Sequence, residues 1–152
     1  MLTKTKIKII DEDDLRKILD MEYENSSQIR LCKYALLLAK HILELIEYNS
    51  INYTIIQQGF KINEQWQKGM ARMYDVRQAG FEIHRLAKAC KDPIESNALR
   101  VVGQAVATGH MKEHAMVASD YAIKVINLLY PQDRDSVKKE RLWQINLLKS
   151  SV

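Results

Sequence analysis

The chain has 152 residues, which is the size of one domain that can bury a hydrophobic core without disulfides. Its 23 basic and 19 acidic residues are interspersed and leave a net charge of +4. An excess this small, without a clustered basic face, argues against nucleic acid as a partner. With 5 Gly and 2 Pro, the composition favours helices. We predict an all-α, single-domain bundle of about six or seven helices over residues 1–152.

Nothing in the sequence has the features of a secretory signal or a membrane span. Residues 1–14 are charged and lack an apolar segment followed by a small-residue cleavage site. The most apolar stretch, YALLLAKHILELI (34–46), is interrupted by charged residues and is too short to cross a bilayer. Cys32 and Cys90 lack C-x-x-C spacing, so we expect two buried free thiols. We therefore expect a cytoplasmic protein with no membrane partner.

The first half of the chain predicts four helices. Residues 1–11 contain the alternating stretch KIKII and are expected to form an extended arm, because no second strand is available to pair with it. Asp13 or Asp14 begins a first helix that ends near Met21. The second helix follows an N-cap at Ser26 or Ser27 and ends near Asn49, with a core stripe at steps of three and four. That stripe consists of Ile29, Cys32, Leu36, Ala39, Leu43 and Ile46. This half also contains a third helix over 53–68 and a fourth over 71–89. One face of the fourth helix carries Met73, Val76, Gly80, Ile83, Ala87 and Cys90.

The second half opens with the clearest start signal in the chain, DPIE (92–95). Asp92 is a suitable N-cap, Pro93 fits the first helical position, and Glu95 occupies the capping-box position. This fifth helix carries Val101, Val102, Ala105 and Val106, and Gly109 ends it just before His110. A sixth segment then runs to about Tyr130, where Pro131 stops it, and a last helix over 135–148 offers Val137, Leu142, Ile145 and Leu148 to the core.

The segment HMKEH (110–114) raises the question of a metal site. Two histidines at i,i+4 with an adjacent glutamate form the H-x-x-E-H pattern, which zinc peptidases use when both imidazoles lie on one helix. Such an enzyme also needs a third ligand, and Asp120, six residues after His114, would face another side of a helix. A metal site without catalysis, formed by His84, His110 and His114, is one alternative. The other is a structural role, in which the histidines bond to Thr108 or Tyr121.

Four segments resemble one family of bacterial proteins, and the similarity covers the chain from about residue 12 onward. They are RLCKYALLLAKHILELI (30–46), DVRQAGFEIHRLAKA (75–89), ALRVVGQAVATGHMKEHAMVASDYAIKV (98–125) and ERLWQ (140–144). The most specific part, GQAVATGHMKEHA, is a close relative of the motif G-x-A-V-A-T-x-H followed by a second histidine. The chain is thereby identified as similar to the immunity proteins encoded beside bacterial polymorphic toxins. The resemblance implies an all-helical fold and direct, non-catalytic binding of a cognate toxin.

The resemblance also implies a set of site residues. We expect none of them to be catalytic, and we expect no cofactor unless the three histidines hold a transition metal. The positions that match the family pattern are Arg77, His84, Gly103, Thr108, His110, His114 and Tyr121. The chain departs from the pattern at Gly109, where relatives are expected to carry alanine, and at Asp120, where they tend to be apolar. A structural module that self-associates into a homo-oligomer through small-residue faces near Gly80 and Ala105 is an alternative.

Overall fold

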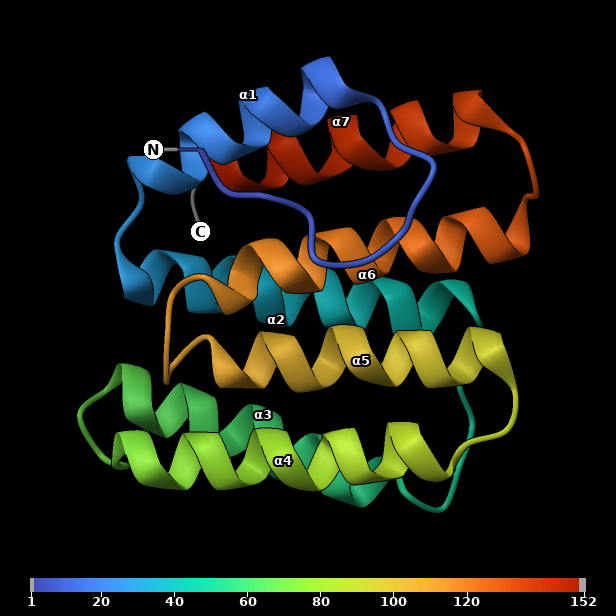
Figure 1. Cartoon of the computed structure of the whole chain (residues 1–152). Coiled ribbons are helices and arrows are strands. Elements are labelled where there is room, and N and C mark those ends of the chain that lie inside the picture. The colour runs from blue at the N-terminus through green and yellow to red at the C-terminus, as the bar shows by residue number, and fades with distance from the viewer. Residues whose placement is uncertain (1, 151–152) are drawn as a thin grey trace.

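The computed structural model describes residues 2–150, and within this range it contains seven α-helices and no strand (Figure 1). The all-α prediction is therefore confirmed. Residues 1, 151 and 152, at the two ends of the predicted domain and arm, lie outside the described residues. The helices are α1 (Asp13–Glu24), α2 (Gln28–Leu45), α3 (Tyr53–Gln67), α4 (Met73–Ala89), α5 (Pro93–Ala107), α6 (His114–Leu129) and α7 (Arg134–Ser150).

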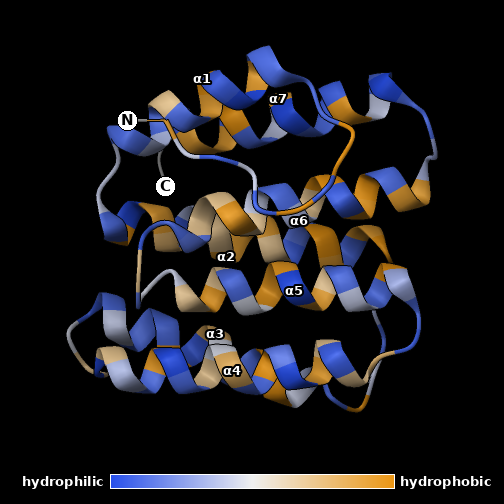
Figure 2. Ribbon diagram, in the orientation of Figure 1, coloured by the Kyte–Doolittle hydropathy of each residue, from blue (hydrophilic) through white to orange (hydrophobic). Residues whose placement is uncertain are grey.

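Helix α5 occupies the middle of the bundle and packs against α4, α6, α2 and α3 (Figure 1). The α1–α7 pair covers α6 on one side, and α3 and α4 form the opposite side. Hydrophobic residues concentrate on α2, α5 and α6 (Figure 2), as expected for helices buried on more than one face. No helix within residues 2–150 is long and apolar enough to cross a lipid bilayer.

Two helix starts follow the local chemistry that the sequence predicts. The Ser27 hydroxyl accepts a hydrogen bond from the Arg30 amide at 3.1 Å, and the Asp92 carboxylate accepts from the Ile94 amide at 3.1 Å. Glu95 instead lies near the thiol of Cys90, which donates to it at 3.5 Å. Cys90 is half-buried, so the prediction of two buried thiols is correct only for Cys32.

The predicted core is confirmed for α5, where Val101, Val102, Ala105 and Val106 are fully buried. Three other predicted core residues are exposed: Ile29 by 43%, Met73 by 54% and Leu142 by 39%. Ile29 and Met73 lie in the first turns of their helices. Periodicity identifies which face of a helix is apolar but not how far the neighbouring helix extends along it. Residues in a first turn, such as Ile29 and Met73, were therefore wrongly assigned to the core.

The segment before α1, residues 2–12, forms no helix and crosses the surface between α1, α6 and α7 (Figure 1). Polar side chains hold it in place. The Ile10 amide donates to the Asn127 side chain at 2.8 Å, and the Asn127 amide donates back to the Ile10 carbonyl at 3.1 Å. The Thr3 amide donates to Asp20 at 2.6 Å.

A buried ionic network joins this segment to α1, α6 and α7. Arg141 has no exposed side-chain surface and donates to Asp11 at 2.7 Å and to Asp120 at 2.8 Å. Arg16 also donates to Asp120, through Nε at 3.0 Å and Nη2 at 2.9 Å. Asp120, at which the chain departs from the family pattern, therefore pairs with two buried arginines.

Candidate functional site

The predicted site residues gather around a pocket of about 310 Å³ between α4, the end of α5 and the α5–α6 turn. The lining contains Arg77, Gly80, Phe81, His84, Gln104, Ala107, His110, Met111 and His114. Four of the seven family-motif positions line this pocket, and we refer to it as the histidine pocket. Sequence reasoning found these four and grouped His84, His110 and His114 as a candidate metal site, but it did not place Arg77 beside them.

The two histidines of HMKEH do not lie on one helix. Helix α5 ends at Ala107, and His110 lies in the following turn, where its amide donates to the Ala107 carbonyl at 2.8 Å. His114 is the first residue of α6. Their rings are stacked with centroids 5.9 Å apart. The break that Gly109 predicts is therefore present, and the helical i,i+4 arrangement of a zinc peptidase is not.

Gly109 is required here by packing and not by backbone conformation. The one glycine with positive φ among the described residues is Gly69, at the end of α3. A Cβ atom at Gly109 would lie 2.9 Å from Cγ1 of Val76 and 3.4 Å from the Trp66 ring. The absence of a side chain lets the α5–α6 turn lie directly against α3 and α4.

Gly103 has a similar role for His84. A Cβ atom at Gly103 would lie 2.7 to 2.8 Å from three atoms of the His84 ring. The glycine in the middle of α5 therefore leaves the space that the imidazole of α4 occupies. This contact gives a physical reason for the family-motif glycine, although Gly at a helix interior costs about 1 kcal/mol relative to Ala.

A row of polar side chains connects the histidines. Arg100 approaches Nδ1 of His84 at 3.1 Å, and the side-chain nitrogen of Gln104 lies 3.5 Å from Nε2 of His84. The side-chain oxygen of Gln104 accepts a hydrogen bond from Nδ1 of His114 at 2.6 Å. Sequence analysis missed Arg100 and Gln104. Their i,i+4 spacing is the signal that could have placed both on one face of α5.

The surroundings of His84 and His114 disfavour the charged form of both imidazoles. Burial lowers the pKa of His84 to about 4, and the charges of Arg100 and His114 lower it further. Burial also lowers the pKa of His114, with added contributions from His110 and Lys6 that outweigh the opposing charge of Glu113. A neutral imidazole interacts with its neighbours through hydrogen bonds. The positive charges of Arg100 and Lys6 near these rings favour an anion over a cation.

Thr108 and Tyr121 lie outside this pocket. Thr108 is fully buried, its hydroxyl donates to the Gln104 carbonyl at 3.1 Å, and its own carbonyl accepts from Gln28 at 2.9 Å. Tyr121 packs partly buried against the core. Both positions therefore support the α5–α6 turn and α6 and do not contact a ligand in the pocket.

The geometry offers little to a metal ion at these histidines. Across residues 2–150 no group of three His, Cys, Asp or Glu side chains is arranged to hold one. Both ring nitrogens of His84 already face Arg100 and Gln104. Glu113, the residue a hydrolase would use as general base, is exposed and does not line the pocket.

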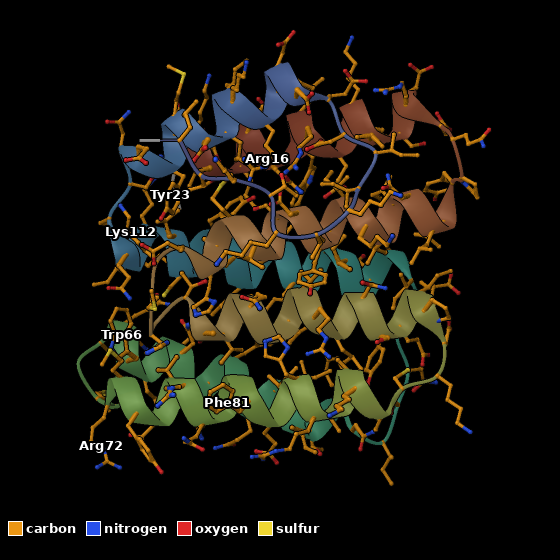
Figure 3. The ribbon with its side chains drawn as sticks, viewed as in Figure 1. Arg16, Tyr23, Trp66, Arg72, Phe81 and Lys112 are labelled. Atoms are coloured by element: carbon orange, nitrogen blue, oxygen red, sulfur yellow. The ribbon has the colours of Figure 1, made fainter. Side chains whose placement is uncertain are left out.

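The exposed side of α4 beside the pocket carries large apolar side chains. Met73 is 54% exposed, Tyr74 57% and Phe81 43%, and Met111 from the α5–α6 turn is 47% exposed. Two arginines lie over the aromatic rings: Arg72 is 5.5 Å from the centre of Tyr74, and Arg77 is 5.1 Å from the centre of Phe81. Figure 3 places Arg72 at one end of α4 and Phe81 farther along it. We call this surface, Met73, Tyr74, Arg77, Phe81 and Met111, the α4 patch.

A second pocket of about 230 Å³ lies between α2, α6 and α7. The His41 ring stacks on Trp143 at 3.7 Å, and His41 pairs with Glu140 at 2.9 Å. Trp66 and Trp143 are both half-buried and pack against the core. None of the residues lining this pocket is a family-motif position.

No curated protein and no solved structure matches the chain significantly. A family model, described as Imm-5 like putative immunity protein, matches residues 21–151. The match spans all of α2 to α6 and contains every residue that lines the histidine pocket. The chain belongs to this Imm-5 like immunity protein family.

Proposed function

We propose that this protein neutralises a cognate bacterial toxin by binding it directly, without catalysing a reaction. The family to which the chain belongs supports an immunity role in general. The observation that carries the proposal is the α4 patch, which borders the pocket formed by four family-motif residues. We place the protein in the bacterial cytoplasm, since its two free cysteines suit a reducing compartment.

The composition of the α4 patch supports a role in protein binding. Tyrosine, phenylalanine, methionine and arginine are enriched at protein interfaces, where a few large side chains account for most of the affinity. Arg77 gives the patch a basic character, and Arg72 lies next to it, although Asp75 pairs with Arg72 at 3.0 Å. We therefore expect the toxin to present an acidic surface, which would also speed association.

The experiment is co-expression with candidate polymorphic-toxin domains, chosen from the genes that neighbour this one, followed by pull-down and a growth-protection assay. We expect Phe81→Ala and Met111→Ala each to weaken binding by about tenfold or more, because truncation of a central interface residue typically costs over 1 kcal/mol. Leu142→Ala, at an exposed apolar residue on α7, is the matched control and should bind as the wild type does.

Two results would contradict the proposal. One is the absence of both a complex and protection with the wild-type protein. The other is full binding by Phe81→Ala and Met111→Ala together, with Leu142→Ala as the weakened variant, which would move the interface from α4 to α7.

A further inference from the structure

We propose that the pocket between α2, α6 and α7 binds a small organic amine, whose ammonium group bonds to the carboxylate of Glu140. The pocket has a volume of about 230 Å³, and we call it the Glu140 pocket. Its lining includes His41, Tyr130, Ser136, Lys139, Glu140 and Trp143. Helices α4 and α7 lie on opposite sides of the bundle (Figure 1), so a toxin bound to the α4 patch would leave this pocket open. The inference is therefore independent of the function proposed above.

The buried carboxylate of Glu140 has a protein partner for only one of its two oxygens. The side chain is 5% exposed, and Oε1 lies 2.9 Å from Nε2 of His41. Oε2 is nearly closed to solvent and has no hydrogen-bond partner among residues 2–150. Whether or not the His41 ring is charged, its contact satisfies only Oε1. A buried acceptor without a donor is costly, so a ligand that supplies the donor is bound favourably.

The shape of the site favours a compact donor. Glu140 borders the pocket, and the terminal torsion of a glutamate is soft. The carboxylate can therefore turn Oε2 toward a donor in the pocket at little cost. An ammonium group is a compact point charge with three donors, which suits an oxygen with so little exposed surface.

The charges of the lining favour a cation over an anion. The Ser136 hydroxyl donates to Asp133 at 2.9 Å, so its oxygen remains as an acceptor. Lys139 is the one lysine or arginine in the lining, and it is exposed, so solvent screens its charge more than that of buried Glu140. One carboxylate and one imidazole are too few ligands for a metal ion. The lining therefore suits an organic cation.

Aromatic and aliphatic side chains define the stem of the ligand. The Trp143 ring stacks on His41 with centroids 3.7 Å apart, and Tyr130 is 44% exposed. Leu45 and Ile126 also line the pocket. Aromatic faces attract an ammonium group as well as an apolar stem. The volume equals that of about eight water molecules at about 30 Å³ each, which is room for an amine on a single ring or a short chain.

The test is an NMR titration of the ¹⁵N-labelled full chain with benzylamine, benzyl alcohol and benzoate at constant pH and ionic strength, up to about 50 mM. The chain has 2 tryptophans, so the indole N–H of Trp143 reports on the pocket and that of Trp66, on α3, is the internal control. We expect benzylamine to cause a saturable shift of the Trp143 signal alone. Benzyl alcohol should bind at least about fivefold more weakly, and benzoate should cause no saturable shift.

Three results of this titration would overturn the proposal. The absence of a saturable shift with benzylamine would mean that water alone satisfies Oε2 of Glu140. Binding of benzyl alcohol or benzoate as tight as that of benzylamine would mean that the site does not select a cation. Equal shifts of the Trp66 and Trp143 signals would mean that the amine binds without a defined site.

Two glutamate variants separate a contact with Glu140 from a general charge effect. Glu140→Gln removes the negative charge and keeps an oxygen that can accept from His41, and it should weaken benzylamine binding by at least about fivefold. Glu44→Gln removes an exposed carboxylate of α2 that does not line the pocket, and should leave binding unchanged. Equal affinities of the two variants would contradict a site at Glu140.

A lysine variant tests the proposal without altering a buried residue. Lys139→Gln removes the exposed cation of the lining and should strengthen benzylamine binding by about twofold, because like charges repel. Lys138→Gln removes the exposed neighbouring lysine, which does not line the pocket, and should leave binding unchanged. Unchanged or weaker binding by Lys139→Gln would contradict a site for a cation, even if Glu140→Gln did not fold.

Discussion

Asp120 of α6 accepts a hydrogen bond from Arg141 of α7 at 2.8 Å, at a position where Arg141 is 0% and Asp120 3% exposed. The same carboxylate accepts two hydrogen bonds from Arg16 of α1. One aspartate therefore joins three helices by pairing with two buried arginines, and Asp11 supplies a second carboxylate to Arg141. Removing one member of such a group leaves buried charge uncompensated, which costs more than the intact pair contributes.

The first prediction follows from this arrangement. Asp120→Ala should lower the free energy of unfolding by about 3 to 5 kcal/mol, because Arg141 and Arg16 lose their shared partner. Urea denaturation measures the change. Glu82→Ala, which removes an exposed carboxylate from α4, is the control and should change stability by about 0.5 kcal/mol or less. Similar small losses in the two variants would show that the network is not needed for stability.

The second prediction concerns pH and Asp11. Burial by itself would raise the pKa of Asp11, but the hydrogen bond and charge of Arg141 outweigh it and hold the pKa below its ordinary value of 3.8. A carboxyl group with a lowered pKa stabilises the fold above the unfolded pKa and loses that contribution as pH falls through the folded pKa. Asp11→Asn should therefore be less stable than the wild type at pH 7, by about 1 to 3 kcal/mol.

The difference in free energy of unfolding between the wild type and Asp11→Asn should become smaller below about pH 4. Chemical denaturation of wild type and Asp11→Asn at pH 7, 4 and 3 measures it. A difference that does not change with pH would exclude ionised Asp11 as the cause. Asp14→Asn, at an exposed carboxylate at the start of α1, provides the comparison.

The third prediction addresses the fit between Gly103 and His84. Gly103→Ala should displace the His84 ring, since the new Cβ would otherwise lie 2.7 Å from Cε1. We expect a loss of about 1 to 3 kcal/mol from overpacking, against a gain of about 1 kcal/mol from helix propensity. The displaced ring should also become more exposed, and the pKa of His84 should rise from about 4 toward 6.5.

Histidine NMR and urea denaturation measure the two effects of Gly103→Ala separately. The double variant Gly103→Ala with His84→Ala has room for the methyl group, so it should recover stability relative to Gly103→Ala alone. An unchanged pKa of His84 in the single variant would mean that the ring is not held by this contact.

The fourth prediction uses His84 as a source of pH-dependent stability. Its pKa is lowered to about 4 from 6.5, first by burial and then by Arg100 and His114. The folded protein therefore binds less of this proton than the unfolded chain between pH 6.5 and 4, so stability falls as pH falls through that window. Denaturation across this range measures how steeply the free energy of unfolding changes with pH, and this slope should be smaller in His84→Gln than in the wild type. Equal slopes in the two proteins would contradict the lowered pKa of His84.

The fifth prediction distinguishes the two thiols. Burial raises the pKa of Cys32 to about 11, despite the opposing hydrogen bond from Asn63, and the side chain is fully buried. Cys90 is half-buried at the end of α4. A thiol reagent should therefore modify one cysteine in the folded protein, and Cys90→Ser should abolish that reaction. Fast modification of both thiols under native conditions would contradict the burial of Cys32.

The sequence by itself determined the helices and several of their starts, because the signals involved are local. Some predicted ends were wrong: the second helix was expected to end near Asn49 and ends at Leu45. Ser27, Asp92 and Pro93 begin helices by satisfying or omitting amides of the first turn, so no distant residue is needed to identify them. The end of α5 before His110 was also predicted, although the reason differs. Gly109 allows close packing on Val76 and does not adopt a left-handed conformation.

The family resemblance identified residues of the pocket but not how they act. Arg77, His84, His110 and His114 come from three separate parts of the fold, and only the packing of α4 on α5 and the α5–α6 turn brings them together. Gln104 carries no recognisable motif, yet it bonds to His114 and faces His84. Its role depends on distances between helices that spacing along one helix cannot supply.

The tertiary structure alone decided the pairing of charges. Asp11, Asp120 and Arg141 are separated by as many as 130 residues and lie on segments that local patterns treat as unrelated. A buried charge is stable only with its partner, and that partner is selected by the way the N-terminal segment, α6 and α7 meet. Helix formation depends on neighbours within about four residues, whereas charge burial depends on the whole bundle. The helices of this protein could therefore be predicted from its sequence, and the pairing of its buried charges could not.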